Sequence, residues 1–303
     1  MELVKQSSEI WESQGSLKDI ERAARVCYKS EDKITEDDSS AIKLVENLIK
    51  RKHYAMLEFG KDIILYLDDL EAHYFFVRFL HLSCFHSIDF LSHDCHNGII
   101  VIINPRAGLE IIEYLESDNI EEESEVAISF YNAFIFNLSK IITGDRKILK
   151  CNREISGFTG DIEEKKKVTV KFITNRGVTH ELVRHRLCSF AQKSTRYCDE
   201  KGDIEFIEPP WYDNSKNVWD SSNLFCEQLF YTEMNYKHLR NFNWKPEQAR
   251  EILPNALKTE IVVKATIEEW KHIFELRCDK AAHPQMRDLM IDLQNQFVKQ
   301  ELI

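Results

Sequence analysis

The chain of 303 residues lacks the segments that usually separate domains or lead a protein to a membrane. It has no stretch rich in Pro, Gly or Ser, no internal repeat and no low-complexity tract, so we expect a single domain over residues 1–303. The opening residues lack the apolar core of a signal peptide, and no apolar run approaches the roughly 20 residues of a membrane helix. We therefore expect a cytoplasmic protein with no membrane partner.

Paired cysteines and an excess of basic residues are also absent. The 8 Cys residues are scattered and form no C-x-x-C pair, which is typical of reduced thiols rather than of a disulfide framework. The formal net charge is −11, which argues against sequence-independent binding to nucleic acid. The remaining composition is that of an ordinary globular protein, with 43% hydrophobic and 30% charged residues.

The most informative stretch runs from residue 168 to residue 197. Residues 168–172 alternate between apolar and polar side chains, which predicts a half-buried strand. The alternation breaks at 175–177, where Gly177 tolerates backbone angles that other residues resist. From 178 to 190 the apolar residues have helical spacing, so we expect a helix over this range.

This predicted helix and the loop after it concentrate cations in an otherwise acidic chain. The polar residues here are His180, Arg184, His185, Arg186, Gln192, Lys193, Ser194 and Arg196. Consecutive helical residues point about 100° apart, so the Arg-His-Arg run cannot lie on one solvated face. Together with the hydroxyl groups that follow, these donors predict an anion site, and phosphate is its simplest ligand. The alternative is a solvated basic helix face, which is the common use of such residues.

The same residues resemble the signature of flavin-dependent thymidylate synthases. Arg184-His185-Arg186, seven further residues and Ser194 match the RHR-x7-S motif of that family. Similar blocks follow in order at 246–260 and 269–287, and the segments 22–28 and 53–58 echo the blocks that precede the motif. Only residues 59–167, approximately, have no secure counterpart.

This resemblance implies an α+β fold, in which a central mixed or antiparallel sheet is flanked by long helices in a single domain. It also implies the reductive methylation of dUMP to dTMP, with methylenetetrahydrofolate as carbon donor and FAD reduced by NADPH as hydride source. The residues favour the same chemistry, because neither Cys188 nor Cys198 has a neighbouring base that would activate a thiolate. A fixed cluster of Arg residues can instead stabilise charge that develops on the pyrimidine.

The roles of single residues follow from the resemblance, position by position. Arg184 and Arg277 would be catalytic. The residues that would bind dUMP are Gln192, Ser194, Thr195, Arg196, Arg250 and Arg277, with Ser194 and Arg196 at the phosphate. The residues that would bind FAD are His53, Arg184, His185, Arg186, His272 and His283. The family builds its sites across a homotetramer, so some of these residues would act in neighbouring subunits. Simpler alternatives are that Ser194 caps a helix and that Arg277 pairs with Glu275 or Asp279.

Some positions depart from the family pattern. Ala191 and Gln192 stand where many relatives have Asn and Glu, and Lys193 adds a positive charge. Loss of a carboxylate would change how the site treats the pyrimidine or the flavin edge. Two alternatives therefore remain: a flavoprotein that acts on another pyrimidine nucleotide, and a non-catalytic nucleotide-binding relative.

A dense group of imidazole and thiol side chains lies outside these motifs. Its members are His81, Cys84, His86, His93, Cys95 and His96. These are the usual ligands of zinc, but their spacing fits no standard zinc template, so we expect core or surface residues and no metal.

The rest of the chain carries weaker patterns. They predict helices over 17–28, 39–51, 70–91, 126–142 and 221–241, and strands over 62–67, 98–104, 204–207 and 260–265. Thr266 and Glu269 predict a capping box at the start of a further helix.

Overall fold

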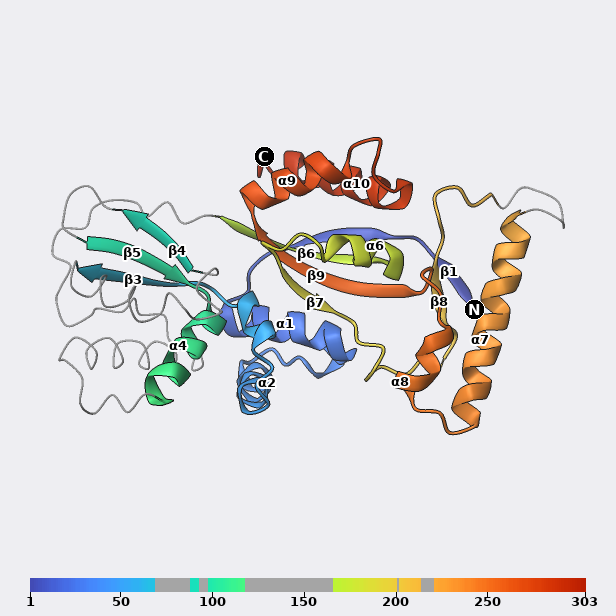
Figure 1. Cartoon of the computed structure of the whole chain (residues 1–303), viewed down its shortest axis with the longest axis horizontal. Coiled ribbons are helices and arrows are strands. Elements are labelled where there is room, and N and C mark those ends of the chain that lie inside the picture. Colours follow the sequence, from blue (N-terminus) through green and yellow to red (C-terminus); the bar gives the residue numbers. More distant parts are fainter. Residues whose placement is uncertain (69–87, 93–97, 118–165, 201, 214–220) are drawn as a thin grey trace. The chain divides into compact units, whose positions relative to one another are not determined.

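The computed structural model describes residues 1–68, 88–92, 98–117, 166–200, 202–213 and 221–303 (Figure 1). The chain divides into two compact units. Unit 1 comprises Met1–Glu12, Ala23–Asp32 and Glu164–Ile303, and unit 2 comprises Ser13–Arg22 and Lys33–Glu163. The prediction that the whole chain is one domain stays a prediction.

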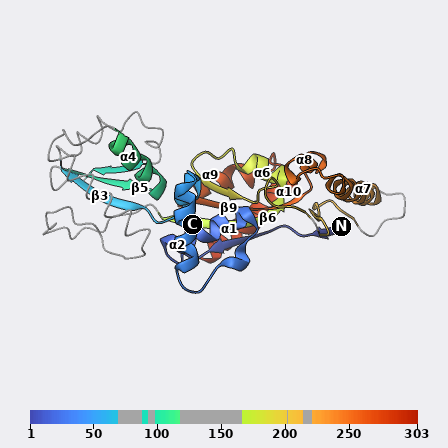
Figure 2. The same ribbon diagram turned by 90° about the horizontal axis from the view of Figure 1, so that it is seen from below.

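Unit 1 is organised around a four-stranded antiparallel sheet in the order β2-β6-β9-β7. These strands are β2 (Ser7–Trp11), β6 (Lys167–Asn175), β9 (Lys258–Thr266) and β7 (Ser189–Gln192). The long strands β6 and β9 are paired along their whole length (Figure 1), and Figure 2 gives the view of the same strands from below. Every second residue of β6 from Val168 is buried, which confirms the predicted half-buried strand.

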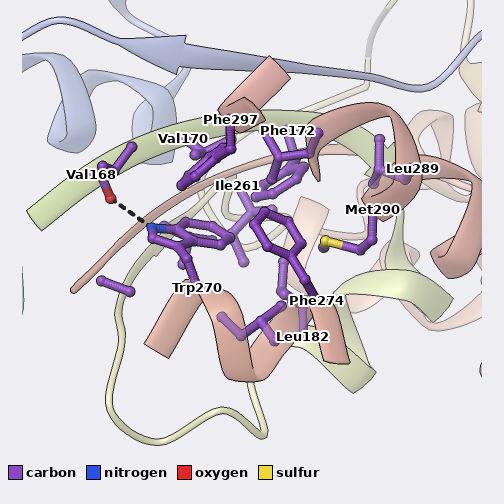
Figure 3. Close-up of a cluster of buried hydrophobic side chains, with 14 of the residues drawn as sticks. Val168, Val170, Phe172, Leu182, Ile261, Trp270, Phe274, Leu289, Met290 and Phe297 are labelled. Atoms are coloured by element: carbon purple, nitrogen blue, oxygen red, sulfur yellow. Dashed lines mark hydrogen bonds between the residues drawn. The ribbon is translucent and has the colours of Figure 1, made fainter. Parts of the chain in front are cut away.

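Two helices, α9 (Ile267–Arg277) and α10 (Pro284–Lys299), cover one face of this sheet (Figure 1). Their apolar residues and those of β6 and β9 form one buried cluster. Trp270 lies at its centre, fully buried, with Phe297 and Phe274 beside it (Figure 3). The indole Nε1 of Trp270 donates to the carbonyl oxygen of Val168 at 3.1 Å, which satisfies the one polar atom of this side chain.

A second, smaller core of unit 1 lies beneath the long helix α7 (Ser221–Asn241). There β1 (Glu2–Val4) pairs in parallel with β8 (Glu205–Ile207). Leu229 and Tyr236 of α7 are buried against β8, together with the short α8 (Pro246–Ala249). The 3-10 turn η5 (Arg250–Ile252) follows α8 directly and leads back toward β9.

Unit 2 contains an antiparallel three-stranded sheet in the order β3-β5-β4. Its strands are β3 (Ile63–Asp68), β5 (Gly98–Ile103) and β4 (Ile88–Ser92), and its helical elements are α2 (Ser39–Lys50), η2 (Tyr54–Phe59) and α4 (Pro105–Ser117). Helix α1 (Ser16–Tyr28) has residues in both units, and the 3-10 turn η1 (Glu31–Lys33) follows it. Arg106 at the start of α4 forms ion pairs with Glu58 at 2.6 Å and with Glu110 at 2.8 Å.

Most predicted elements are confirmed, including the α+β class and the antiparallel central sheet. The predicted helix over 70–91 is wrong at its end, because residues 88–91 lie in β4 and pair with β5. An apolar neighbouring strand supplies backbone partners there that local spacing cannot reveal. The predicted helix over 126–142 lies outside the described residues. None of the helices in the described part of the chain is long and apolar enough to cross a membrane.

Candidate functional site

The strand-to-helix junction after β6 is set by Asn175. Its side-chain oxygen accepts a hydrogen bond from the backbone N–H of Val178 at 2.8 Å, which caps α6 (Arg176–Leu182). Its amide nitrogen donates to Gln285 Oε1 at 2.7 Å and ties the junction to α10. The break predicted at 175–177 is therefore the start of the helix itself, with no loop in between.

The helix predicted over 178–190 is wrong beyond Leu182, where α6 ends. Residues 189–192 form β7, which pairs with β9 from Ser189↔Lys264 to Gln192↔Ile261. The motif Arg-His-Arg thus lies on the turn between α6 and β7. His185 is buried there, whereas Arg184 and Arg186 are exposed. The expectation that the three do not share one solvated face is confirmed, but a turn and not a helix separates them.

His185 and Arg277 form the first polar cluster of the site. Nε of Arg277, the last residue of α9, donates to Nε2 of His185 at 3.0 Å. The other guanidinium nitrogens donate to Glu181, to its carboxylate at 3.1 Å and to its carbonyl oxygen at 3.2 Å. The alternative that Arg277 pairs with Glu275 or Asp279 is therefore wrong. Three contacts fix this guanidinium against the end of α6.

The imidazole of His185 is neutral at neutral pH. Burial, and then the charges of Arg277 and His272, lower its pKa from 6.5 to about 4. Since Nε2 accepts from Arg277, the ring proton is on Nδ1. The ring of His272 lies edge-on to it, with 6.2 Å between the centroids.

We expect this depressed pKa to make folding sensitive to acid. The unfolded chain takes up a proton on His185 near pH 6.5, whereas the folded chain does so only near pH 4. The free energy of unfolding should therefore fall as the pH drops through this window, by about 2 kcal/mol between about pH 7 and about pH 4.5. Glu269, whose pKa burial raises, acts in the opposite direction. Chemical denaturation of His185→Gln should show a shallower pH dependence than wild type, and His238→Gln, at an exposed position of α7, is the control. Equal slopes in all three proteins would contradict the assignment.

Arg250 and Arg176 form the second polar cluster. Nη1 of Arg250 donates to the hydroxyl of Thr195 at 3.3 Å. Burial, and then the charge of Arg250, lower the pKa of Arg176. Among the residues that the structure describes, no acidic side chain is within ion-pair distance of Arg176. Nε of Arg250 lies 3.8 Å from the carboxylate of Glu251, but that carboxylate is exposed and its charge is screened by solvent. The two guanidinium groups are therefore a favourable site for an anion.

Sequence reasoning missed Arg176. The available signal was its position immediately after the strand, in the same short segment as the Arg-His-Arg motif. Arg176 and Glu181 are separated by roughly 8 Å along the axis of α6. The two polar clusters thus lie at the two ends of one short helix.

Residues 153–300 match the model of a family described as thymidylate synthase complementing protein. This segment, just under half of the chain, is similar to that family. The resemblance predicted from the motifs is thereby confirmed.

Curated relatives of the chain include flavin-dependent thymidylate synthases from three organisms. The protein of Mycobacterium marinum is 32% identical over 136 residues, which cover 41% of this chain and 54% of that protein. The protein of Pyrococcus furiosus is 31% identical over 42% of this chain and 52% of that protein. The protein of Geobacter sulfurreducens is 32% identical over 39% of this chain and 50% of that protein. The chain thus spans about half the length of the curated relatives it matches.

Two solved structures are similar to the chain at a lower level. The UMP/dUMP methylase PolB from Streptomyces cacaoi, bound with 5-Br dUMP, is 14% identical with a TM-score of 0.41, over 99% of this chain and 93% of that one. Thymidylate synthase X from Helicobacter pylori, with FAD and dUMP, is 22% identical with a TM-score of 0.35, over 43% and 66%. Both TM-scores are too low to carry an argument about this chain.

Within residues 153–300, the loop after β7 contains the remaining residues that are predicted to bind the nucleotide. The backbone N–H of Ser194 donates to the carbonyl oxygen of Cys27 at 2.9 Å, and its hydroxyl accepts from the N–H of Arg196 at 3.3 Å. The guanidinium of Arg196 is exposed, 5.2 Å from the ring centroid of Tyr197 and 3.8 Å from Glu247. Ser194 therefore shapes the turn that presents Arg196 and Thr195.

The three residues that depart from the family pattern have structural partners. Ala191 is buried. The amide nitrogen of Gln192 donates to the hydroxyls of Thr179 at 2.9 Å and Thr259 at 3.3 Å. The ammonium of Lys193 is paired with Glu200 at 2.5 Å, so it adds no free charge to the site.

The two thiols of this region are protonated; Cys198 is buried and Cys188 is half-buried. Burial, and then the charge of Glu269, raise the pKa of Cys188 to about 12. Burial also raises the pKa of Cys198, more than Lys193 lowers it. Neither thiol is poised as a thiolate nucleophile, which agrees with the absence of an activating base in the sequence.

Two further residues, His283 and His53, are predicted to bind the flavin. His283 precedes α10, and its ring is 5.7 Å from that of Trp211, an exposed residue that sequence reasoning did not select. His53 precedes η2 in unit 2, and its predicted contact with the flavin stays a prediction. The His/Cys group at 81–96 lies outside the described residues. Within the described ranges, no group of three or more His, Cys, Asp or Glu side chains is placed to hold a metal.

Proposed function

We propose that this protein is a flavin-dependent thymidylate synthase, which converts dUMP to dTMP with methylenetetrahydrofolate as carbon donor and NADPH as reductant of FAD. One observation carries the proposal. The two ends of α6 each carry fixed or clustered cations. At the last turn, the guanidinium of Arg277 is held on the neutral imidazole of His185. At the first turn lie the guanidinium groups of Arg176 and Arg250. The roughly 8 Å between these ends suits two parts of one nucleotide.

The phosphate of dUMP would bind at the start of α6. Arg176 and Arg250 supply the charge, and a guanidinium can bind two phosphate oxygens at once. The hydroxyl of Thr195, already held by Arg250, and that of Ser194 add short-range donors. Arg196 is exposed on the same loop and completes the set that the motif predicts.

The pyrimidine would lie at the other end of α6, against Arg277. Because Glu181 and His185 hold this guanidinium in place, it needs no rearrangement to stabilise negative charge that develops on the ring. Exposed Arg184 on the adjacent turn is the second cation available there. The nitrogen of Gln192 is bonded internally, so its carbonyl oxygen is the group that remains to accept from the base.

The residues around His185 fit a flavin nucleotide. The exposed guanidinium groups of Arg184 and Arg186 flank the buried neutral imidazole, and His272 places a second ring beside it. Cations suit the pyrophosphate of FAD, and uncharged rings suit its isoalloxazine. When bound, FAD would supply the hydride that it takes from NADPH. In this arrangement His185 binds and orients, and its low pKa keeps it from competing as a proton donor.

We further propose that the chain assembles as a homotetramer through α7. Its outer side carries exposed apolar residues at helical spacing, Leu224, Tyr231 and Met234, with Phe230 beside them. An apolar stripe of this kind on one helix typically marks an interface.

Charges introduced into this stripe should break the assembly. The double variant Leu224→Asp/Tyr231→Asp is expected to lower the mass measured by light scattering from that of a tetramer to that of a smaller species. Val298→Asp places a charge on an exposed apolar residue of α10 and should leave the mass unchanged. A monomeric wild type, or an unaltered mass in the double variant, would refute this interface.

One reaction tests the function. The full chain is incubated without oxygen with FAD, NADPH, methylenetetrahydrofolate and dUMP, and dTMP is measured by mass spectrometry. We expect dTMP that requires added flavin, and no methylated product when UMP replaces dUMP. A product from UMP would identify a flavoprotein for another pyrimidine nucleotide. A protein that binds dUMP but neither binds nor reduces FAD would be a non-catalytic nucleotide-binding relative.

A further inference from the structure

Glu269 has a different role from the one that its place in the sequence suggests. The pattern Thr266-x-x-Glu269 predicts a capping box, in which each side chain bonds the backbone N–H of the other. Half of this box is present: the hydroxyl of Thr266 accepts from the N–H of Glu269 at 3.2 Å. The carboxylate does not return the bond to Thr266, and its Oε1 lies 3.7 Å from Nδ1 of His185.

The titratable neighbours of this carboxylate are His185, Cys188 and His272. Glu269 is buried, and burial raises its pKa. It faces Cys188, whose thiol stays protonated, and the nearby His272. A buried carboxylate that does not bond to the helix cap lowers the stability of the fold unless another donor interacts with it. The Nδ1–H of His185, 3.7 Å from Oε1, is a donor close enough for electrostatic attraction but longer than a hydrogen bond.

The geometry orders four side chains in a row. Glu181 and Nε2 of His185 hold the guanidinium of Arg277 from two sides. This bond requires that Nε2 carries no proton, so the ring proton must be on Nδ1, which is the nitrogen that faces Glu269. The row therefore runs from Glu269 through His185 and Arg277 to Glu181.

We propose that Glu269 is a positioning residue for the site. Its carboxylate, 3.7 Å from Nδ1, attracts the Nδ1–H of His185 electrostatically, which keeps Nε2 an acceptor and so keeps Arg277 in place. The inference rests on the proposed function, because it assigns Glu269 to the support of two residues proposed to meet the flavin and the pyrimidine. Glu269 itself contacts neither, and acts only through His185.

The test removes the acceptor in two ways and keeps it in a third. Glu269→Ala deletes the group, Glu269→Leu fills the same volume without an acceptor, and Glu269→Gln retains a carbonyl oxygen. Glu268→Ala is the control, because Glu268 is an exposed carboxylate in the same turn of α9. Circular dichroism establishes which variants are folded.

The first readout is the tautomer of His185, which does not depend on activity. In protein labelled with nitrogen-15 at histidine, His185→Gln identifies the signals of this ring. Wild type, Glu268→Ala and Glu269→Gln should show a single Nδ1–H tautomer. The Ala and Leu variants should show a mixture of tautomers. A single Nδ1–H tautomer in every folded variant that lacks the acceptor would overturn the proposal.

The second readout is catalysis. Misplacement of a reacting group by an ångström can cost about a hundredfold. We expect Glu269→Leu to lower kcat for dTMP formation by about 10- to 100-fold, with KM for dUMP changed by less than about threefold. Glu269→Gln should restore kcat to within about threefold of wild type.

An unchanged kcat in the Leu variant would overturn the proposal. If wild type made no dTMP, the proposed function would fail, while the tautomer measurement would still decide the role of Glu269.

Discussion

Replacement of Arg277 by Ala should lower kcat for dTMP formation by about a thousandfold, because it removes a fixed charge from the proposed pyrimidine site. The guanidinium is held by Glu181 and His185 before any ligand arrives, so its stabilisation of the reacting ring needs no reorganisation. We expect most of the loss in kcat, with the dissociation constant for dUMP raised no more than about tenfold, since the phosphate site at Arg176 and Arg250 remains intact.

Two further variants separate the contributions to this loss. Arg277→Lys keeps the charge but not the forked geometry that contacts two residues at once, so its kcat should fall between those of wild type and Arg277→Ala. Lys271→Ala removes an exposed cation from the same helix and should leave kcat unchanged. Steady-state kinetics with dUMP as the varied substrate would check these values. An Arg277→Ala protein with wild-type kcat would remove Arg277 from the catalytic machinery.

The Trp270→Ala variant should lose about 3 to 5 kcal/mol of stability, which is the usual cost when a large core aromatic residue is truncated. Trp270 is completely buried between the sheet and α10 (Figure 3). Its ring is 5.5 Å from that of Phe297 and 6.0 Å from that of Phe274. The variant also loses the hydrogen bond to the carbonyl oxygen of Val168. Because folded proteins are stable by only about 5 to 15 kcal/mol, this variant should be close to unfolding.

Chemical denaturation of matched variants tests this prediction. Trp270→Phe keeps most of the ring volume but lacks the indole N–H, so it should cost about 1 to 2 kcal/mol, mainly for the lost hydrogen bond. Trp244→Ala truncates the same residue type at an exposed position and should cost less than about 0.5 kcal/mol. Equal losses for the Ala variants at positions 270 and 244 would show that the core is not centred on Trp270.

The parts of the fold that the sequence predicts are those whose pattern agrees with their tertiary role. The apolar alternation of β6 faces a real core, and so it identified the strand. Residues 183–190 are the opposite case. Their apolar residues have helical spacing, but the last of them begin β7, which pairs with β9, a strand about 70 residues further along the chain. Such distant backbone pairing outweighs a local preference, and nothing in the local sequence reveals the partner.

The candidate site divides in the same way. The motif located Arg184, His185 and Arg186, but the burial of His185 depends on Arg277, which is 92 residues away. Arg176 became a candidate only because η5 brings Arg250 beside it. Glu269 had a sufficient local explanation as half of a capping box, and that explanation concealed its place next to His185. Contacts between distant segments thus supplied what the motif could not.

The most direct test of the proposed function is a single turnover that begins with the reduced flavin. The protein is loaded with FAD, reduced without oxygen, freed of NADPH, and mixed with dUMP and methylenetetrahydrofolate. Flavin absorbance and dTMP are followed together. We predict that flavin is reoxidised and that dTMP appears in an equimolar amount and at the same rate. Flavin that stays reduced, or that is reoxidised without dTMP, would contradict the proposed function.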